Sequence, residues 1–181
     1  SPNHTPMASL ISMGFRAMTS IRYASCILLA TVFFNGYEAN ALEEETNEGT
    51  VKAAIEDFYT ALNQVFVGEL KDMDNIWSHS DDVTYHGPTG GIKQGWNAVR
   101  KDWVKQAKLK LGGKVKPEKL TYIIGRDIAV VSNYEIGENI GRDRKPIRVA
   151  IRATSTFRKE KGKWKMIGHH ADPLPYLSET N

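Results

Sequence analysis

The segment PIRVAIRATSTFRKEKGKWKMIGHHADP, residues 146–173, decides the fold of this chain. Along residues 147–158, β-branched and other apolar residues alternate with arginine and threonine. A period of two is typical of a strand that has one apolar and one polar face. The charged sequence at 159–162 predicts a tight turn, after which residues 164–170 return as the neighbouring strand. The segment therefore predicts a β-hairpin whose second strand ends in two histidines and an aspartate.

Helices are expected before this hairpin. Apolar residues spaced three and four apart predict a long helix over 46–70 and another helix from about 96 to 111, ended by Gly112-Gly113. Asp74 is a candidate cap for a short helix between them, and residues 83–86 form a short strand candidate. The first part of the chain is thus mainly helical.

Strands follow the last expected helix, at 120–124, 128–136, 147–157 and 164–170. Helices followed by a meander of antiparallel strands are typical of an α+β arrangement in which helices cover one side of the sheet. We therefore expect a single α+β domain over 42–181, with a cone-shaped, curved antiparallel sheet wrapped around the N-terminal helices.

The N-terminal region has the three parts of a secretory signal peptide. Two arginines precede an eleven-residue apolar run, 24–34, which is followed by Ala39-Asn40-Ala41 and then by acidic residues. The run is shorter than the roughly 20 apolar residues that cross a bilayer. We predict cleavage after Ala41, a periplasmic or secreted protein, and no membrane anchor afterwards. A buried helix is the alternative, and residues 1–6 precede the first methionine, Met7.

Cysteine usage and charge limit the chemistry of the expected mature chain. The single cysteine, Cys26, lies in the predicted signal segment, so residues 42–181 lack a thiolate nucleophile and a cysteine-based zinc site. Removing residues 1–41 takes away two basic residues and one acid, which leaves 22 basic and 20 acidic residues. A net charge of about +2 does not indicate nucleic-acid binding. The lysines of 101–119 are interpreted as a solvated helix face rather than a phosphate-binding patch.

Three stretches resemble the nuclear-transport-factor-2-like, or SnoaL-like, superfamily of cone-shaped α+β barrels, over roughly residues 46–173. They are Asp74–Trp77 with Ser80–Tyr85, then Gly87-Pro88 with Gly95–Val99, and finally Arg152–Arg158 with Gly162–Ile167 and His170. The last stretch is similar to the association domain of calcium/calmodulin-dependent kinase II and its bacterial relatives. The resemblance implies a pocket between the concave sheet and the helices for a small organic ligand.

The resemblance does not extend to the residues of ketosteroid isomerase. That enzyme needs a carboxylate before the proline of a strand turn, a tyrosine and a protonated acid. Here Gly87 precedes Pro88, the first-helix tyrosine position falls on Phe58 with Tyr59 adjacent, and residues 147–158 contain no acid. The isomerase set is therefore absent, and fold alone leaves function open.

The best candidate for acid–base chemistry is His170 with Asp172. Neighbours on a strand point to opposite sides, so only one of His169 and His170 can face the pocket. Alternation from Trp164 through Met166 predicts that this one is His170, and the resemblance also places the pocket residue there. A histidine aligned by a carboxylate can act as a general base. The alternative is a structural histidine whose hydrogen bonds are satisfied.

Further ligand-binding candidates are aromatic, histidine and arginine side chains. They are Trp77, His79, Tyr85, His86, Trp96, Tyr134, Arg148 and Arg152. If the strand face that carries the two arginines lines the pocket, they form a clamp for a carboxylate. If it does not, they face solvent or a subunit interface. The second alternative is favoured, because the opposite face of the strand is apolar and must pack against the helices. The aromatic residues are pocket lining or core. The histidine spacings do not fit a metal site, so we predict no metal and no cofactor.

Together these observations predict an exported domain that binds a small apolar or carboxylate-bearing molecule. The domain is expected to be a homodimer and to support acid–base chemistry of an isomerase, cyclase or dehydratase type. The alternative is a non-catalytic association module that resembles the kinase II association domain. A pocket in which His170, Tyr85 and an arginine converge would favour the first function, and an interior filled by aromatic side chains would favour the second.

Overall fold

The computed structural model of the chain describes residues 50–174, which belong to one compact unit. The predicted signal peptide over 1–41, the first turn of the helix expected from residue 46, and the tail from residue 175 lie outside the described residues. Within 50–174 no helix is long and apolar enough to cross a membrane.

Within residues 50–174, three helices precede most of the sheet. The first helix is described over residues 50–65, α2 spans Lys71–Ile76 and α3 spans Trp96–Leu109. The apolar stripe predicted for the first helix is buried along its length, at Val51, Ile55, Phe58, Leu62 and Val65. The α3 helix ends two residues earlier than predicted because Lys110 adopts a left-handed conformation, with φ of 48°, and its N–H bonds to the Ala107 carbonyl.

In the described part of the chain, six strands form one mixed but mostly antiparallel sheet, which is open rather than closed into a barrel. The strands are β1 (Thr84–His86), β2 (Lys93–Gln94), β3 (Lys114–Ile124), β4 (Ile128–Ile140), β5 (Pro146–Glu160) and β6 (Lys163–Pro173). Their order is β2-β1-β6-β5-β4-β3, and β1 runs parallel to β6. The predicted α+β class is confirmed, whereas the strands β3–β6 are longer than predicted and β2 was not predicted.

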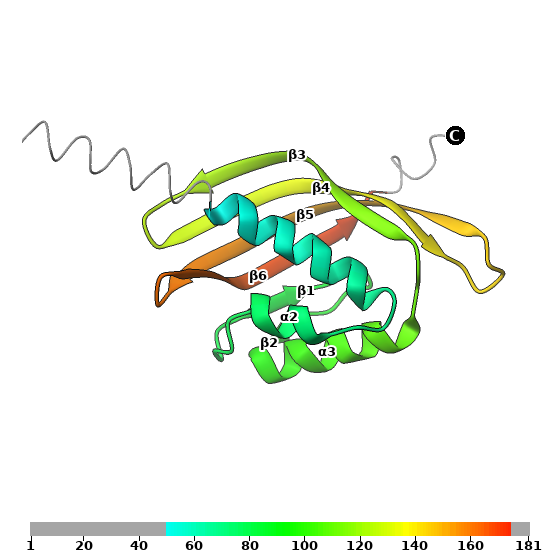
Figure 1. The fold of residues 1–181 in the computed structure, drawn as a ribbon, viewed down its shortest axis with the longest axis horizontal. Coiled ribbons are helices and arrows are strands. Elements are labelled where there is room, and N and C mark those ends of the chain that lie inside the picture. Colours follow the sequence, from blue (N-terminus) through cyan, green and yellow to red (C-terminus); the bar gives the residue numbers. More distant parts are fainter. Residues whose placement is uncertain (1–49, 175–181) are drawn as a thin grey trace, which may run out of the picture. The chain divides into compact units, whose positions relative to one another are not determined.

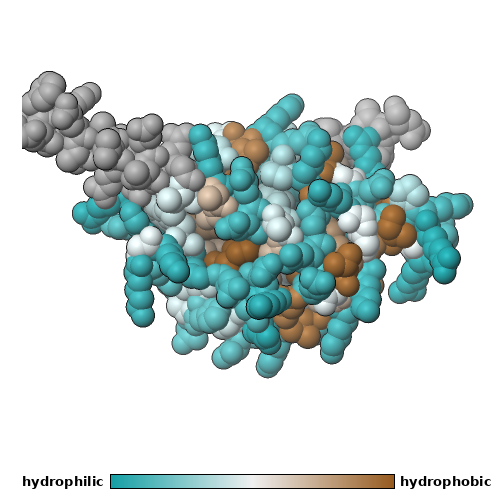
Figure 2. Space-filling model, viewed as in Figure 1, coloured by the Kyte–Doolittle hydropathy of each residue, from teal (hydrophilic) through white to brown (hydrophobic). Residues whose placement is uncertain are grey.

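The helices cover one face of the curved sheet (Figure 1). The core lies between the two layers, where the buried face of the first helix meets the inward side chains of β3, β4, β5 and β6. Seen from the helix side, the surface is mainly hydrophilic, with separate apolar side chains between the charged ones (Figure 2). The sheet and the first helix therefore enclose the region in which a functional site is expected.

An irregularity in β6 changes which of its side chains point inward. On β5, Thr156 and Phe157 are consecutive, but their partners on β6 are Gly168 and Met166. Ile167 is thus an extra residue in the β6 strand, which is the definition of a β-bulge. Beyond this bulge the alternation of inward and outward side chains is shifted by one residue.

Candidate functional site

Five polar side chains are buried between the first helix and the sheet, and we call them the interior cluster. They are Tyr59 from the first helix, Asn133 and Glu135 from β4, Ser155 from β5, and His169 from β6. None is more than 5% exposed. Buried polar groups are costly unless they are hydrogen-bonded, so the contacts within this cluster matter for stability as well as for chemistry.

Glu135 is the centre of the interior cluster. The Tyr59 hydroxyl donates a hydrogen bond to Glu135 Oε1 at 3.1 Å, and Asn133 Nδ2 donates to the Tyr59 oxygen at 2.7 Å. His169 Nε2 lies 3.4 Å from the same Glu135 Oε1, which is ion-pair range although longer than an ordinary hydrogen bond. Two potential proton donors therefore converge on one carboxylate oxygen.

The second ring nitrogen of His169 is also occupied. Ser155 Oγ lies 3.0 Å from His169 Nδ1, across directly paired positions of β5 and β6. In the tautomer with its proton on Nε2, His169 directs that proton at the Glu135 carboxylate and Nδ1 accepts the hydrogen bond from the Ser155 hydroxyl. This arrangement orients the imidazole and selects one tautomer.

Burial keeps the two interior tyrosines neutral. Loss of solvent, reinforced by the nearby charge of Glu135, raises the pKa of Tyr59 far above its ordinary value. Burial likewise raises the pKa of Tyr85, although the hydrogen bond that Gln106 Nε2 donates to its hydroxyl at 3.0 Å acts in the opposite direction. Both phenols are thus available as neutral hydrogen-bond donors or acceptors.

Aromatic rings surround His169. The centroid of Phe58 lies 4.7 Å from that of the imidazole, and Tyr85 stacks on the imidazole at 6.0 Å. Trp103 continues this wall, 4.6 Å from Tyr85, and Trp77 lies 6.3 Å from Trp103. The acid–base pair is therefore enclosed in a low-dielectric, aromatic environment, where electrostatic interactions are stronger than in water.

The inward histidine is His169, and the prediction that His170 faces the interior is wrong. The bulge at Ile167 explains the error, because it brings Met166 and His169, three residues apart, onto the same face. The side chains of His170 and Asp172 are both 56% exposed, with His170 Nε2 3.1 Å from Asp172 Oδ2. The predicted histidine–carboxylate pair exists, but it lies on the surface.

Comparison with known proteins agrees with this architecture. A family model described as SnoaL-like domain matches residues 51–175. The chain belongs to the SnoaL-like family. No curated protein matches the sequence.

Among solved structures, this SnoaL-like chain is similar to a candidate calcium/calmodulin-dependent protein kinase type II association domain from Thiobacillus denitrificans. The two share 29% identity over 69% of this chain and 95% of that one, with a TM-score of 0.59. A candidate dehydratase of the NTF2-like family from Streptomyces avermitilis shares 19% identity over 72% of this chain and 98% of that one, with a TM-score of 0.64. At that identity the second likeness shows the fold alone.

Of the predicted ligand-binding residues of this SnoaL-like domain, Trp77, Tyr85 and Trp96 are buried in the core. The Tyr85 hydroxyl lies against Gly87, where an added Cβ would come within 2.7 Å of it. Glycine at the position before Pro88 therefore leaves space for the tyrosine hydroxyl, where a carboxylate-bearing side chain would collide with it.

The remaining predicted ligand-binding residues are not brought together in the interior. His79 stacks on Trp96 at 4.4 Å, with His79 itself exposed. The ring of His86 lies 5.0 Å from that of the exposed His170. Within residues 50–174, no group of three or more histidine, cysteine or acidic side chains is arranged to hold a metal ion.

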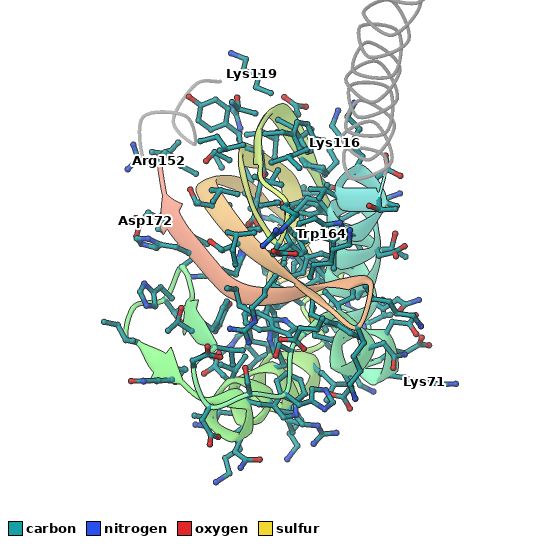
Figure 3. All side chains as sticks on the ribbon, turned by 90° about the vertical axis from the view of Figure 1, so that its left-hand side faces the viewer. Lys71, Lys116, Lys119, Arg152, Trp164 and Asp172 are labelled. Carbon is teal, nitrogen blue, oxygen red and sulfur yellow. The ribbon has the colours of Figure 1, made fainter. Side chains whose placement is uncertain are left out.

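The two arginines proposed as a clamp do not line the interior. Arg148 and Arg152 are exposed, and Arg152 is paired in register with Asp172 on β6 and with Tyr134 on β4. Figure 3 shows Arg152 and Asp172 on the side of the sheet away from the helices. On the predicted apolar face of β5, Ala153 and Phe157 are buried whereas Ile147 is 57% exposed. Arg152 precedes the buried Ala153 and therefore points to the opposite side, outward.

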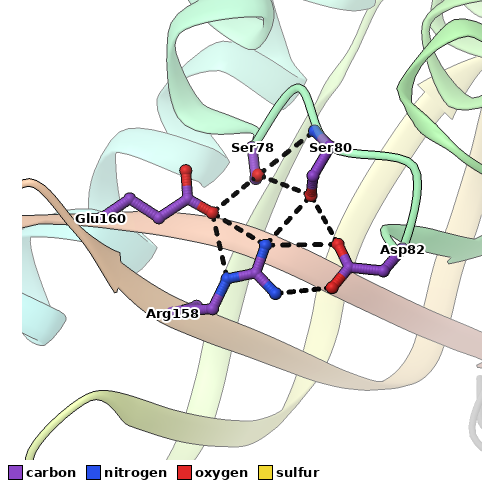
Figure 4. A network of polar contacts seen from close by, with 5 residues as sticks. All are labelled: Ser78, Ser80, Asp82, Arg158 and Glu160. Atoms are coloured by element: carbon purple, nitrogen blue, oxygen red, sulfur yellow. Dashed lines mark hydrogen bonds and ion pairs between the residues drawn. The ribbon is translucent and has the colours of Figure 1, made fainter.

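A second polar group, the surface network, joins the chain before β1 to the β5–β6 hairpin (Figure 4). It consists of Ser78, Ser80, Asp82, Arg158 and Glu160. Arg158 donates from Nη1 to Asp82 Oδ2 at 2.6 Å and from Nη2 to Glu160 Oε1 at 2.8 Å. Its position outside the aromatic interior and its saturated contacts indicate a structural role.

Most of the interior cluster was missed by the sequence-based predictions. The usable signal was a polar residue on an otherwise apolar strand face. On β4, Asn133 and Glu135 continue the inward series that begins with Ala129 and Val131. Ser155 interrupts the inward series of β5 in the same way. A carboxylate and a first-helix tyrosine are thus present in the interior, although at positions other than those of the isomerase comparison.

Proposed function

We propose that this SnoaL-like domain binds a small organic molecule against the interior cluster and that Glu135 transfers a proton on it. The observation that carries the proposal is the convergence of Tyr59 and His169 on one buried carboxylate oxygen, Glu135 Oε1. We assign the reacting role to Oε2, because both of these contacts are made to Oε1. A carboxylate held in a dry aromatic site, next to a histidine, is a typical general base.

The proposed step is proton removal from a carbon next to a carbonyl group. Glu135 Oε2 accepts the proton as the C–H bond breaks, the electron pair moves into the enolate, and the carboxyl group then returns a proton to carbon or oxygen. His169 Nε2 and the Tyr59 hydroxyl hold Oε1 and compensate its charge. Isomerase, cyclase and dehydratase reactions all contain such a step, so the proposal names the chemistry that they share.

Hydrogen–deuterium exchange of a simple ketone tests this proposal. With acetophenone in D₂O, the protein is expected to accelerate deuterium incorporation into the methyl group, measured by NMR. Glu135→Gln keeps the shape of the side chain but removes the base, so it should abolish the acceleration. His170→Asn is the matched surface control and should exchange at the wild-type rate. Exchange no faster than in buffer, or unaffected by Glu135→Gln, would show the proposal to be wrong.

A second candidate function is association. The 29% identity with the Thiobacillus denitrificans association-domain protein favours it, as does the outward face of the sheet, which presents Arg152 next to Asp172. The aromatic side chains that fill the interior, and the position of His170 outside it, also favour association by the criterion stated for the sequence. In this reading the outer faces of two copies pack to form a homodimer. Native mass spectrometry is expected to give twice the chain mass, and Arg152→Glu should reduce the dimer fraction, whereas Lys101→Glu on α3 should not.

Export is proposed on the sequence of residues 8–41. The expected mature protein begins at Leu42 and is periplasmic or secreted. N-terminal sequencing of the protein recovered outside the cytoplasm of its native host checks this expectation, and a mature start far from Leu42 would contradict it.

A further inference from the structure

Three polar atoms in the interior have no hydrogen-bond partner within residues 50–174. They are the indole nitrogens Nε1 of Trp77 and Trp103 and the amide oxygen Oδ1 of Asn133. The two tryptophans are each 1% exposed and Asn133 is 5% exposed. A buried polar group without a partner is rare in native proteins, so three in one core require an explanation.

Ring contacts connect these atoms to the site proposed above. Trp77 contacts Trp103 at 6.3 Å, Trp103 contacts Phe58 at 6.3 Å, and Phe58 contacts Tyr59 at 5.1 Å. The Tyr59 hydroxyl in turn accepts the hydrogen bond from Asn133 Nδ2. The residues that carry the unpartnered atoms therefore pack in the same core as Glu135 and His169.

The chemistry of these atoms restricts a ligand. An indole N–H can only donate, so the two tryptophans require an acceptor. Asn133 Oδ1 can only accept, so it requires a donor. A molecule that carries a carbonyl oxygen and an N–H or O–H group meets both requirements. The rings of Phe58 and Tyr85 both pack near the imidazole of His169, and aromatic surroundings of this kind favour a planar molecule.

The charge of the interior restricts the ligand further. Among the buried residues of 50–174 there is no lysine or arginine, and Glu135 is the only acid. A carboxylate ligand would therefore enter a low-dielectric region that already holds a carboxylate, and only His169 could offset their repulsion. An ammonium ligand would be attracted to Glu135 but would direct its own donors at the indole N–H groups. Neither charged class matches all the available partners.

We infer that the site takes a neutral, planar carbonyl compound that also carries an N–H or O–H donor, such as a primary aromatic amide. This inference rests on the proposed function, because it names the ligand class of the same site. Arg148 and Arg152, which were predicted to bind a ligand carboxylate, lie on the outer face of the sheet. A carboxylate-bearing ligand in the interior would therefore have no arginine to pair with.

Three probes of nearly equal shape test the charge preference. Benzamide is neutral, benzoate is anionic and benzylamine is cationic at pH 7. Binding to the full protein, measured by NMR titration, is expected to be at least about tenfold tighter for benzamide than for either charged analogue. Benzoate or benzylamine binding as tightly as benzamide would overturn the inference.

The four tryptophans of the chain supply an internal control. In ¹⁵N-labelled protein, benzamide should shift the indole N–H signals of Trp77 and Trp103 downfield as they gain an acceptor. The signals of Trp96, which stacks on His79, and of Trp164, whose Nε1 already donates to Thr50 Oγ1 at 3.0 Å, should not move. Shifts confined to Trp96 and Trp164 would place the ligand elsewhere and contradict the inference.

Substituting single tryptophans tests whether the indole N–H groups contribute to benzamide binding. Trp103→Phe removes one N–H and should weaken benzamide binding about fivefold, whereas Trp96→Phe should leave it unchanged. Wild-type affinity in both variants would overturn the inference. If benzamide fails to bind while acetophenone exchange is still accelerated, the ligand class is wrong and the proposed function stands. If neither occurs, both are wrong.

Discussion

The interior cluster and the surface network contain five residues each and similar functional groups, yet they differ in solvent exposure. In the interior cluster the side chains of His169 and Glu135 are 3% and 5% exposed. In the surface network the side chains of Arg158 and Asp82 are 28% and 62% exposed. Ser78 is the one buried member of the surface network. Water can replace a lost partner of Arg158 or Asp82, but not of the interior residues. The same kind of contact should therefore contribute very different free energies in the two places.

The two groups also differ in completeness. Arg158 in the surface network has three acceptor residues, Asp82, Glu160 and Ser80. The interior cluster leaves an amide oxygen of Asn133 without a partner among the described residues. In the surface network the hydrogen bonds of Arg158 are all made within the protein, and they fix the position of the β5–β6 hairpin. In the interior cluster a buried acceptor is left over, which a hydrogen-bond donor of a ligand can use. Solvent exposure and hydrogen-bond saturation together thus separate the structural group from the candidate site.

The largest expected effect comes from removing the centre of the interior cluster. Glu135→Ala leaves the Tyr59 hydroxyl and His169 Nε2 buried without an acceptor, and should lower the free energy of unfolding by about 3 kcal/mol. Glu135→Gln keeps an acceptor oxygen and should cost less than half as much. Urea denaturation measures both. A loss below about 1 kcal/mol for Glu135→Ala would mean that water reaches the interior cluster and replaces the lost acceptor.

The two adjacent histidines give a matched pair with the next largest effect. His169→Ala removes a ring that contacts Phe58 and Ser155 and should destabilise the fold by about 2 kcal/mol. His170→Ala changes an exposed side chain and should stay within about 0.5 kcal/mol of wild type. Thermal and urea unfolding of both variants check the difference. Equal losses would contradict the position of the bulge at Ile167.

A smaller effect is expected in the surface network. Arg158→Ala removes contacts to Asp82 and Glu160 that solvent can partly replace, so we expect a loss of about 1 kcal/mol. Arg158→Lys keeps the charge but not the planar fork, and should lie between alanine and wild type. The same urea measurements apply, and raising the salt concentration should reduce the difference. A loss as large as that of Glu135→Ala would remove the distinction between the two groups.

The smallest expected effect is a dependence of stability on pH. The hydrogen bond from Arg158 holds the pKa of Asp82 at about 2, below its ordinary value of 3.8. A depressed carboxyl pKa stabilises the fold above the unfolded value and loses that contribution as the pH falls from about 4 to 2. Because Asp82 is exposed, the contribution should not exceed about 0.5 kcal/mol.

Comparing urea midpoints at pH 5 and pH 2.5 measures this contribution. Wild type should lose slightly more stability than Arg158→Ala over that interval, because the variant lacks the contact that depresses the pKa of Asp82. Glu160 should add to the same trend: burial acts to raise its pKa, but hydrogen bonds from Ser78 and Arg158 lower it overall. Identical pH profiles for wild type and variant would contradict the assignment.

The fold was largely predictable from local patterns. The apolar spacing of the first helix appears in the structure along its length, and the alternation of β5 appears from Ala153 to Phe157, whereas Ile147 is 57% exposed. Both patterns are set by burial against a neighbouring layer. The strand β2 was not predictable in this way, because two residues, Lys93 and Gln94, carry no periodicity. It forms only because the chain before α3 lies beside β1, which is a tertiary effect.

The candidate site was predictable only in part. Trp77 and Tyr85 were found because large aromatic residues near strand ends are usually buried. His169 was missed because alternation assumes an unbroken strand, and no residue type marks the bulge at Ile167. Glu135 was missed because an acid in a strand is ordinarily exposed, and its burial depends on Tyr59, 76 positions away. Such long-range compensation has no local signature.

The bulge at Ile167 also bears on how related chains should be aligned and how this one can change. Deleting Ile167 would remove the bulge but leave Met166 opposite Phe157 and His169 opposite Ser155, so His169 would stay in the core. An unbroken strand that keeps Ile167 would instead turn His170 inward. Two descendants with the same final motif could then present different imidazoles to a bound molecule. In this strand, the presence of the bulge determines which histidine faces the core as much as the identities of the residues do.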